Sequence, residues 1–121
     1  MEKHAYPQLV RTFQRLSRFS HLSAIAGWDM ATMMPPGGSR ARGEALAELG
    51  VLQHQLLTDK KVGAWIEAAQ QEDLSEDERA NLREMRRAYD QAALLPESLV
   101  EAKSLAGNRC EHAWRSQRKN N

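Results

Sequence analysis

Cys110, Glu111 and His112 place three side chains of metal-binding type at three consecutive positions. A protein metal site needs three or more nitrogen, sulfur or oxygen ligands that converge on one ion. Consecutive residues on a helix point about 100° apart around its axis, so these three side chains diverge. We therefore interpret Cys110 as a small core thiol, with Glu111 and His112 as surface groups beside it.

The four histidines are His4, His21, His54 and His112, and their spacing excludes a zinc-binding His-Glu-x-x-His helix. None of them is followed by glutamate and then by a second histidine at the required distance. We interpret His21 and His54 as helix-surface or packing residues, because nothing in the sequence brings them together. No catalytic, cofactor-binding or metal-binding residue is assigned to this chain.

Asp29 follows Trp28 in a stretch that is rich in large apolar side chains. A buried functional carboxylate is one interpretation, but an aspartate at such a place more often caps a helix or accepts from loop amides. Met30, Met33 and Met34 offer thioether sulfur, a ligand for soft metals. Adaptable core packing is the commoner use of methionine, so we prefer a structural role for all four polar or sulfur groups.

Arg79, Arg83, Arg86 and Arg87 form a basic stripe on one expected helix. Clustered arginines suit phosphate, which makes a nucleic acid one conceivable partner. Acidic side chains are interleaved with the stripe, namely Glu76, Asp77, Glu78, Glu84 and Asp90. We favour a solvated face with partners one turn away, or an ionic contact to another domain, and expect no nucleic-acid partner.

The composition describes one small domain with a thin core, or with a core that a partner completes. The chain has 121 residues, 41% of them hydrophobic, and a formal net charge of +1. That charge gives no general attraction to nucleic acid or to an anionic membrane. One cysteine cannot form an internal disulfide, and no apolar run is long enough to span a bilayer. We expect a soluble cytoplasmic protein without a membrane partner.

Apolar residues recur at helical spacing along the chain, and alternating strand patterns are absent, so the predicted class is all-α. Five amphipathic helices are expected over residues 7–26, 39–57, 60–71, 76–93 and 96–118. Short connections would join them into a single helical domain or fragment over residues 1–121.

Residues 27–38 are the one long break in this helical pattern. Pro35 and Pro36 cannot sit inside a helix, because each lacks a backbone donor and clashes with the preceding turn. Gly37 and Gly38 permit the positive φ values that a sharp reversal can require. We expect the large side chains of this stretch, Trp28 among them, to fold back onto the helices.

Local signals mark several helix ends. Ser39 is a plausible N-cap of the second helix, and Asp59 can cap the third. Ser75 and Glu78 have the spacing of a capping box, the sharpest local signal in the chain. The inner side of the last helix is predicted to carry its apolar and small residues, which are Leu99, Ala102, Ala106, Cys110, Ala113 and Trp114.

Four pieces of the sequence together resemble the N-terminal region of the carboxypeptidase Taq (thermostable carboxypeptidase 1) family. The pieces are His21-Leu22-Ser23 with residues 27–38, Leu52-Gln53-His54-Gln55 with Leu57-Thr58-Asp59, residues 78–89, and Leu95-Pro96 through His112-Ala113-Trp114. Their order and spacing follow the family, and they cover nearly the whole chain.

The resemblance implies a mostly helical, zinc-dependent metallocarboxypeptidase that releases C-terminal residues from peptides and that is typically a homodimer. Family members are several times longer than this chain, and their His-Glu-x-x-His zinc site lies downstream of the matching region. The chain then corresponds to a leading helical portion that is inactive alone, with zinc and peptide substrate belonging to the full-length enzyme.

The alternative is a free-standing helical interaction or oligomerisation module without catalytic activity. In that interpretation, apolar surface around Trp65 and Trp114 drives association. The expected partner is a second copy of the chain or the missing catalytic portion.

Overall fold

A computed structural model describes residues 4–118 of the chain, and within that range the secondary structure is helical, without a strand. The elements are α1 (Ala5–Thr32), the 3-10 turn η1 (Pro36–Gly38), α2 (Ser39–Leu57), α3 (Lys60–Ala69), α4 (Glu76–Ala93) and α5 (Glu97–Arg118). The all-α prediction is confirmed. The expected ranges 39–57 and 76–93 coincide with α2 and α4, and the third and fifth helices differ from their expected ranges only at the ends.

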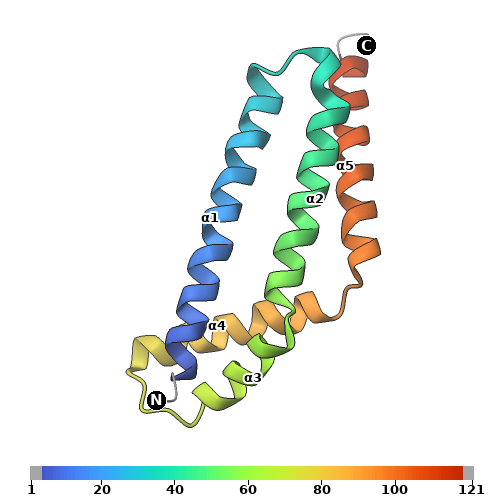
Figure 1. Cartoon of the computed structure of the whole chain (residues 1–121). Helices are drawn as coiled ribbons and strands as arrows, with labels where there is room; N and C mark the ends of the chain where they lie inside the picture. Colours follow the sequence, from blue (N-terminus) through green and yellow to red (C-terminus); the bar gives the residue numbers. More distant parts are fainter. Residues whose placement is uncertain (1–3, 119–121) are drawn as a thin grey trace.

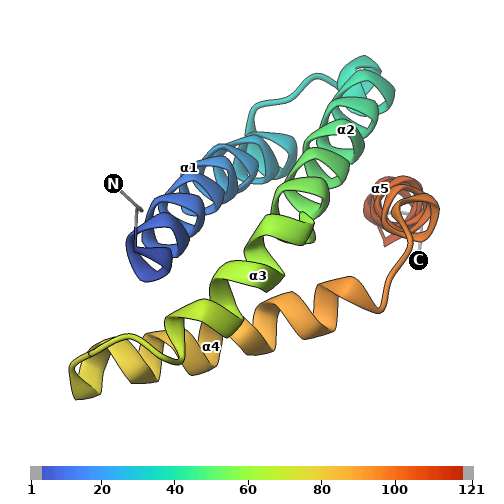
Figure 2. The ribbon, with the colours of Figure 1, turned by 60° about the horizontal axis from the view of Figure 1, so that its bottom comes forward.

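Three of the helices lie lengthwise in the molecule, and the other two cross one of its ends. α1 and α2 run antiparallel through η1, and α5 lies along the other side of α2 (Figure 1). α3 and α4 cross the end where α1 begins (Figure 2). At the opposite end, the last turn of α1, the start of α2 and the C-terminal half of α5 lie together (Figure 1).

The hydrophobic core lies at the end where α1 begins. Its largest cluster takes no residue from α2 or α5 in the described range, although Ala47 of α2 is buried elsewhere. Fully burying one large aliphatic side chain stabilises a fold by about 1.5–3 kcal/mol, and the fully buried Leu9 and Val62 both belong to this cluster. Its members are Ala5, Tyr6 and Leu9 of α1, Val62, Ile66 and Ala69 of α3, and Leu82 and Met85 of α4.

The first turn of α1 is capped from a distant part of the chain. The amide groups of Ala5 and Tyr6 donate to the carboxylate of Glu72, in the connection between α3 and α4. These amides have no acceptor within their own helix. The Tyr6 hydroxyl also accepts from the side-chain amide of Asn81 at 3.3 Å. The start of α1 is therefore tied to α4 by polar as well as apolar contacts.

Two of the predicted caps are confirmed and one is wrong. Asp59 accepts from the backbone N–H of Lys61 at 2.9 Å, at the start of α3. Ser75 and Glu78 form the predicted capping box at the start of α4. Ser39 is the first residue of α2 rather than its N-cap, because η1 leads the chain directly into the helix through Gly38.

The first helix begins at Ala5 and continues to Thr32, whereas the sequence predicted residues 7–26. A glycine inside a helix lowers its stability by only about 1 kcal/mol relative to alanine. Gly27 therefore does not end α1. The chain reverses at Met33–Pro35, and no residue in the range 4–118 has a positive φ. Gly37 and Gly38 both lie in η1, and the turn does not use the positive φ values that glycine permits.

The predicted inner side of the last helix is wrong. Leu99 is 50% exposed and Trp114 is 56% exposed, and no described residue of α5 is buried. The predicted small residues of that side are all exposed, namely Ala102, Ala106, Cys110 and Ala113.

A different face of α5 packs against α2, through less apolar residues. Ser104, Leu105 and Asn108 are its less exposed side chains in this region, and Asn108 lies against the buried Gly43 of α2. A Cβ atom built on Gly43 would lie 2.5 Å from Asn108 Oδ1. α2 and α5 approach closely at Gly43 because glycine has no side chain. The pattern of apolar residues in the sequence does not reveal such a contact.

Candidate functional site

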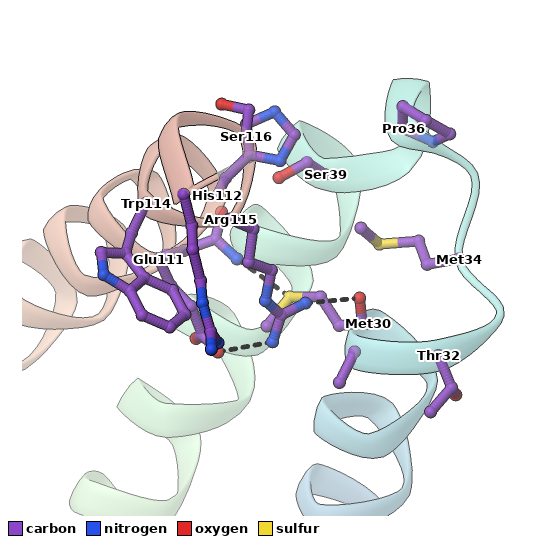
Figure 3. A pocket seen from close by; sticks show the side chains of 13 residues that line it. Met30, Thr32, Met34, Pro36, Ser39, Glu111, His112, Trp114, Arg115 and Ser116 are labelled. Atoms are coloured by element: carbon purple, nitrogen blue, oxygen red, sulfur yellow. Dashed lines mark hydrogen bonds and ion pairs between the residues drawn. The ribbon is translucent and has the colours of Figure 1, made fainter. Parts of the chain in front are cut away.

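An open pocket lies where the end of α1, the start of α2 and the C-terminal half of α5 meet (Figure 3). Its volume is about 680 Å³. The walls come from Met30 and Met34 near the end of α1, Ser39 of α2, and Trp114 and Arg115 of α5. A second open pocket of about 650 Å³ lies beside it, between η1, α2 and α5.

Two arginines from other helices bind the end of α1. Arg42 of α2 donates to the Ala26 carbonyl at 2.8 Å and to the Asp29 carboxylate at 2.7 Å. Arg115 of α5 donates to the Met30 carbonyl at 2.8 Å (Figure 3). Met30 lies in the last turn of α1, where carbonyls lack donors from their own helix and carry its negative dipole end, so the Arg115 guanidinium stabilises this carbonyl.

Asp29 has a structural role in the described chain. Its carboxylate pairs with Arg42, and both side chains are about one-third exposed. Its backbone carbonyl accepts from the N–H groups of both Met33 and Met34 at 2.9 Å. The interpretation of Asp29 as a structural group agrees with these contacts, although the partner is an arginine from the next helix and not a loop amide.

The methionines and Trp28 are only partly folded back, contrary to the expectation. Met30 and Met34 are half-buried, and the Met30 sulfur accepts from the Asn108 side chain at 3.2 Å. Met33 is 73% exposed and Trp28 is 65% exposed. Trp28 lies within α1, which continues through this stretch, and most of its side chain is exposed.

Cys110, Glu111 and His112 do not act together. Cys110 is a free thiol on the exposed side of α5, so its interpretation as a core residue is wrong. Glu111 pairs with Arg115 at 2.6 Å, and His112 lines the pocket from a separate direction (Figure 3). Across residues 4–118, no three His, Cys, Asp or Glu side chains are grouped closely enough to hold a metal ion.

The remaining histidines lie on helices or at a helix start. His21 is exposed on α1, and His54 is half-buried on α2. His4 occupies the N-cap position of α1, and its side chain makes no capping hydrogen bond. Within the described range, none of the three belongs to a metal-binding group.

Three of the four arginines in the stripe on α4 contact acids or a carbonyl. Arg86 pairs with Glu67 of α3 at 3.2 Å and with Asp90, one turn further along α4, at 3.8 Å. Arg87 pairs with Glu84, and Arg79 donates to the Glu72 carbonyl; these distances are 3.6 and 2.9 Å. These contacts match a solvated, ion-paired helix face.

Arg42, Arg115 and Asn108 are the junction residues that the sequence did not reveal. Arg42 contacts residues at sequence separations of 13 and 16, and Arg115 reaches one at a separation of 85. The only local signal was the absence of any basic residue in the last turn of α1, a position where a cation is favourable. Nothing local identifies which distant arginine supplies it.

The described helices have no segment that is both long and apolar enough to cross a lipid bilayer.

Comparisons with known proteins agree on one family. Residues 8–121 match the model of the carboxypeptidase Taq (M32) metallopeptidases. The chain is 34% identical to thermostable carboxypeptidase 1 of Thermus thermophilus over 94% of its own length, which is 23% of that relative. It is 30% identical to the Pyrococcus furiosus thermostable carboxypeptidase 1 over 88% of its length, which is 22% of that protein.

A solved structure shows the same similarity in three dimensions. Trypanosoma cruzi metallocarboxypeptidase 1 matches 84% of this chain with a TM-score of 0.77 and 48% sequence identity, and the match covers 21% of that structure. The chain spans less than a quarter of the length of each of these relatives. Because the family model matches almost the whole sequence, the chain belongs to the carboxypeptidase Taq (M32) metallopeptidase family and corresponds to its N-terminal region.

Proposed function

We propose that this chain is the N-terminal helical part of a zinc-dependent metallocarboxypeptidase and that it hydrolyses no peptide by itself. The observation that carries the proposal is the extent of the similarity. It runs along 94% of this chain but only 23% of the Thermus thermophilus carboxypeptidase. In the intact enzyme the reaction would be hydrolytic release of the C-terminal amino acid from a peptide, with catalytic residues supplied from outside these 121 residues.

The described side chains, those of residues 4–118, do not fit a zinc site of their own. Catalytic zinc takes three protein ligands and leaves one position for water or substrate. The sequence has no His-Glu-x-x-His helix, and residues 4–118 bring no three ligand-type side chains together. We derive no catalytic step from this chain, and its role in the intact enzyme would be to support the substrate-binding and catalytic parts.

The test is an assay of the purified 121-residue protein with an N-blocked dipeptide, in the presence of Zn²⁺ or Co²⁺. We expect no release of the terminal amino acid above the metal-only background, while a full-length family member assayed in parallel is active. Release that depends on the protein and disappears with a chelator would refute the proposal. Calorimetric titration with Zn²⁺ should likewise give no tight, stoichiometric binding.

A second candidate function, a helical interaction or oligomerisation module, is favoured by exposed apolar side chains. Leu22, Ile25 and Trp28 of α1 and Leu99 and Trp114 of α5 are each at least half exposed. Trp65, by contrast, packs against the core, so it offers less surface than expected. Exposed apolar patches favour association with another protein or a second copy.

Self-association distinguishes this second candidate. We propose that the isolated chain forms a dimer or higher oligomer, as the family resemblance also suggests. Light scattering on a size-exclusion column across a hundredfold range of concentration, on the order of 1–100 µM, should show the mass increasing with concentration. A constant monomer mass over this range would contradict the self-association proposal and leave the peptidase proposal intact.

We further propose a cytoplasmic location and no nucleic-acid partner. The single cysteine, Cys110, is what supports the location, since chains built for oxidising compartments usually pair their cysteines. The net charge of +1 and the acidic partners of Arg86 and Arg87 support the second point. Titration with duplex and single-stranded DNA at low salt should give no saturable binding.

A further inference from the structure

A stripe of apolar and small residues on α5 points away from the molecule. The helix turns its less exposed residues, Ser104, Leu105 and Asn108, toward α2. In Figure 2, no other described helix lies on the side of α5 that faces away from α2. The exposed residues on that side, which we call the outer stripe of α5, are Leu99, Ala102, Ala106, Cys110, Ala113 and Trp114.

The outer stripe has the pattern of a helix-packing surface. Its members recur three or four residues apart, so they share one face of α5 over about four turns. Leu99 and Trp114, at its two ends, are 50% and 56% exposed. The small residues between them allow a second helix to approach closely. Because helices are stabilised mainly by burying such a face against another element, the stripe predicts an occupant.

The order of large and small residues fits a second copy of the same stripe. Two identical surfaces related by a twofold axis meet in reverse order, so each must complement itself. If two α5 helices cross antiparallel at Ala106, then Ala102 of each copy faces Cys110 of the other. Leu99 of each copy reaches Trp114 of the other. Large side chains then pack together at both ends, and small ones lie at the crossing.

Two cations flank the outer stripe, and the antiparallel arrangement keeps like charges apart. Lys103 and Arg109 lie three residues on either side of Ala106, at opposite edges of the stripe. Each would lie about 9 Å along the helix axis from its own counterpart in the other copy. This separation is close to the Debye length of about 10 Å at 0.1 M salt, so the repulsion is weak. Added salt should therefore strengthen the contact.

We propose that the outer stripe of α5 is an interface for a second copy of this chain, in which two α5 helices pack antiparallel and cross at Ala106. The proposal rests on the self-association proposed above and is independent of peptidase activity. It goes beyond a general apolar attraction, because it states which residues of the two copies meet.

Disulfide trapping tests this arrangement in the 121-residue protein, whose single cysteine is Cys110. The two Cys110 residues would lie about 12 Å apart along the helix axis, beyond the roughly 7 Å between Cα atoms that a disulfide tolerates. Mild oxidation should therefore link few unmodified chains. Ala102→Cys places a thiol opposite Cys110 of the other copy, and linked dimers should form about tenfold faster. Ala102→Cys with Cys110→Ser is the matched control and should link as slowly as the unmodified chain.

A charge at the crossing provides a second, independent measurement. Ala106→Arg should give the monomer mass in light scattering at concentrations at which the unmodified chain is a dimer, because it places a cation in the apolar contact. Ala24→Arg makes the same change at an exposed alanine of α1 and should leave the dimer intact. If Ala106→Arg does not fold, the comparison of cysteine variants still decides.

The outcomes separate this interface from self-association in general. The interface is overturned if Ala102→Cys links no faster than its control, or if Ala106→Arg keeps the dimer mass. Self-association then occurs through another surface. A constant monomer mass of the unmodified chain overturns both proposals, and the outer stripe would then have another occupant, such as the rest of a full-length family member.

Discussion

Gly43 lies at the closest approach of α2 and α5, and replacing it with alanine sets two effects against each other. Alanine is about 1 kcal/mol more favourable than glycine inside a helix. The new Cβ would lie 2.5 Å from Oδ1 and 2.7 Å from Cγ of Asn108, so the whole amide group must move. Overpacking of this kind costs about 1–3 kcal/mol. We expect Gly43→Ala to lower the free energy of unfolding by about 0–2 kcal/mol.

Gly50→Ala in the same helix is the matched control. A Cβ on Gly50 meets nothing within 4 Å, so only the gain in helix propensity remains. We expect this variant to be more stable than the unmodified chain by about 1 kcal/mol. The two variants should then differ by about 1–3 kcal/mol, which is about 4–12 °C in melting temperature for a chain of this size. Thermal unfolding followed by circular dichroism at 222 nm measures the difference.

Asn108→Ala provides the decisive background for the same experiment, because it removes all three atoms that the new Cβ would approach. In that background Gly43→Ala should become stabilising by about 1 kcal/mol, as at Gly50. Equal stabilisation by Gly43→Ala and Gly50→Ala in the chain with Asn108 intact would refute the packing of α5 on α2 described above.

Two further substitutions test the other end of the molecule. Leu9→Ala, at a fully buried position of the core, should cost about 2–5 kcal/mol, measured by urea unfolding; a cost below about 1 kcal/mol would contradict the described core. Ser75→Ala removes the capping box of α4 and should cost about 1 kcal/mol, and an unchanged unfolding midpoint would show that the cap contributes nothing.

The sequence predicted those elements whose ends depend on nearby residues. α4 begins after Ser75 because its hydroxyl and the Glu78 carboxylate satisfy backbone groups three residues apart. Asp59 acts in the same way two residues ahead of Lys61. Such interactions involve only a few consecutive residues, and they therefore placed the starts of α3 and α4 at their observed positions.

The end of α1 and the orientation of α5 depend on distant partners, and the sequence did not predict them. Residues 27–32 remain helical in a chain where Arg42 and Arg115 bind the carbonyls of Ala26 and Met30. α5 turns its mixed polar face inward because α2 offers the bare backbone of Gly43 there. The spacing of apolar residues along the sequence predicts neither effect. It indicates which side chains face a core, but not how closely two backbones approach.

The stretch 27–38 carries much of the resemblance to the family, yet its described contacts are structural. The Asp29 carboxylate pairs with Arg42. The Asp29 backbone carbonyl accepts hydrogen bonds from the N–H groups of Met33 and Met34. The Thr32 hydroxyl donates to the Trp28 carbonyl at 2.8 Å and completes the last turn of α1. Every one of these bonds either ends a helix or joins it to the next. A motif of this kind specifies how α1, α2 and α5 meet.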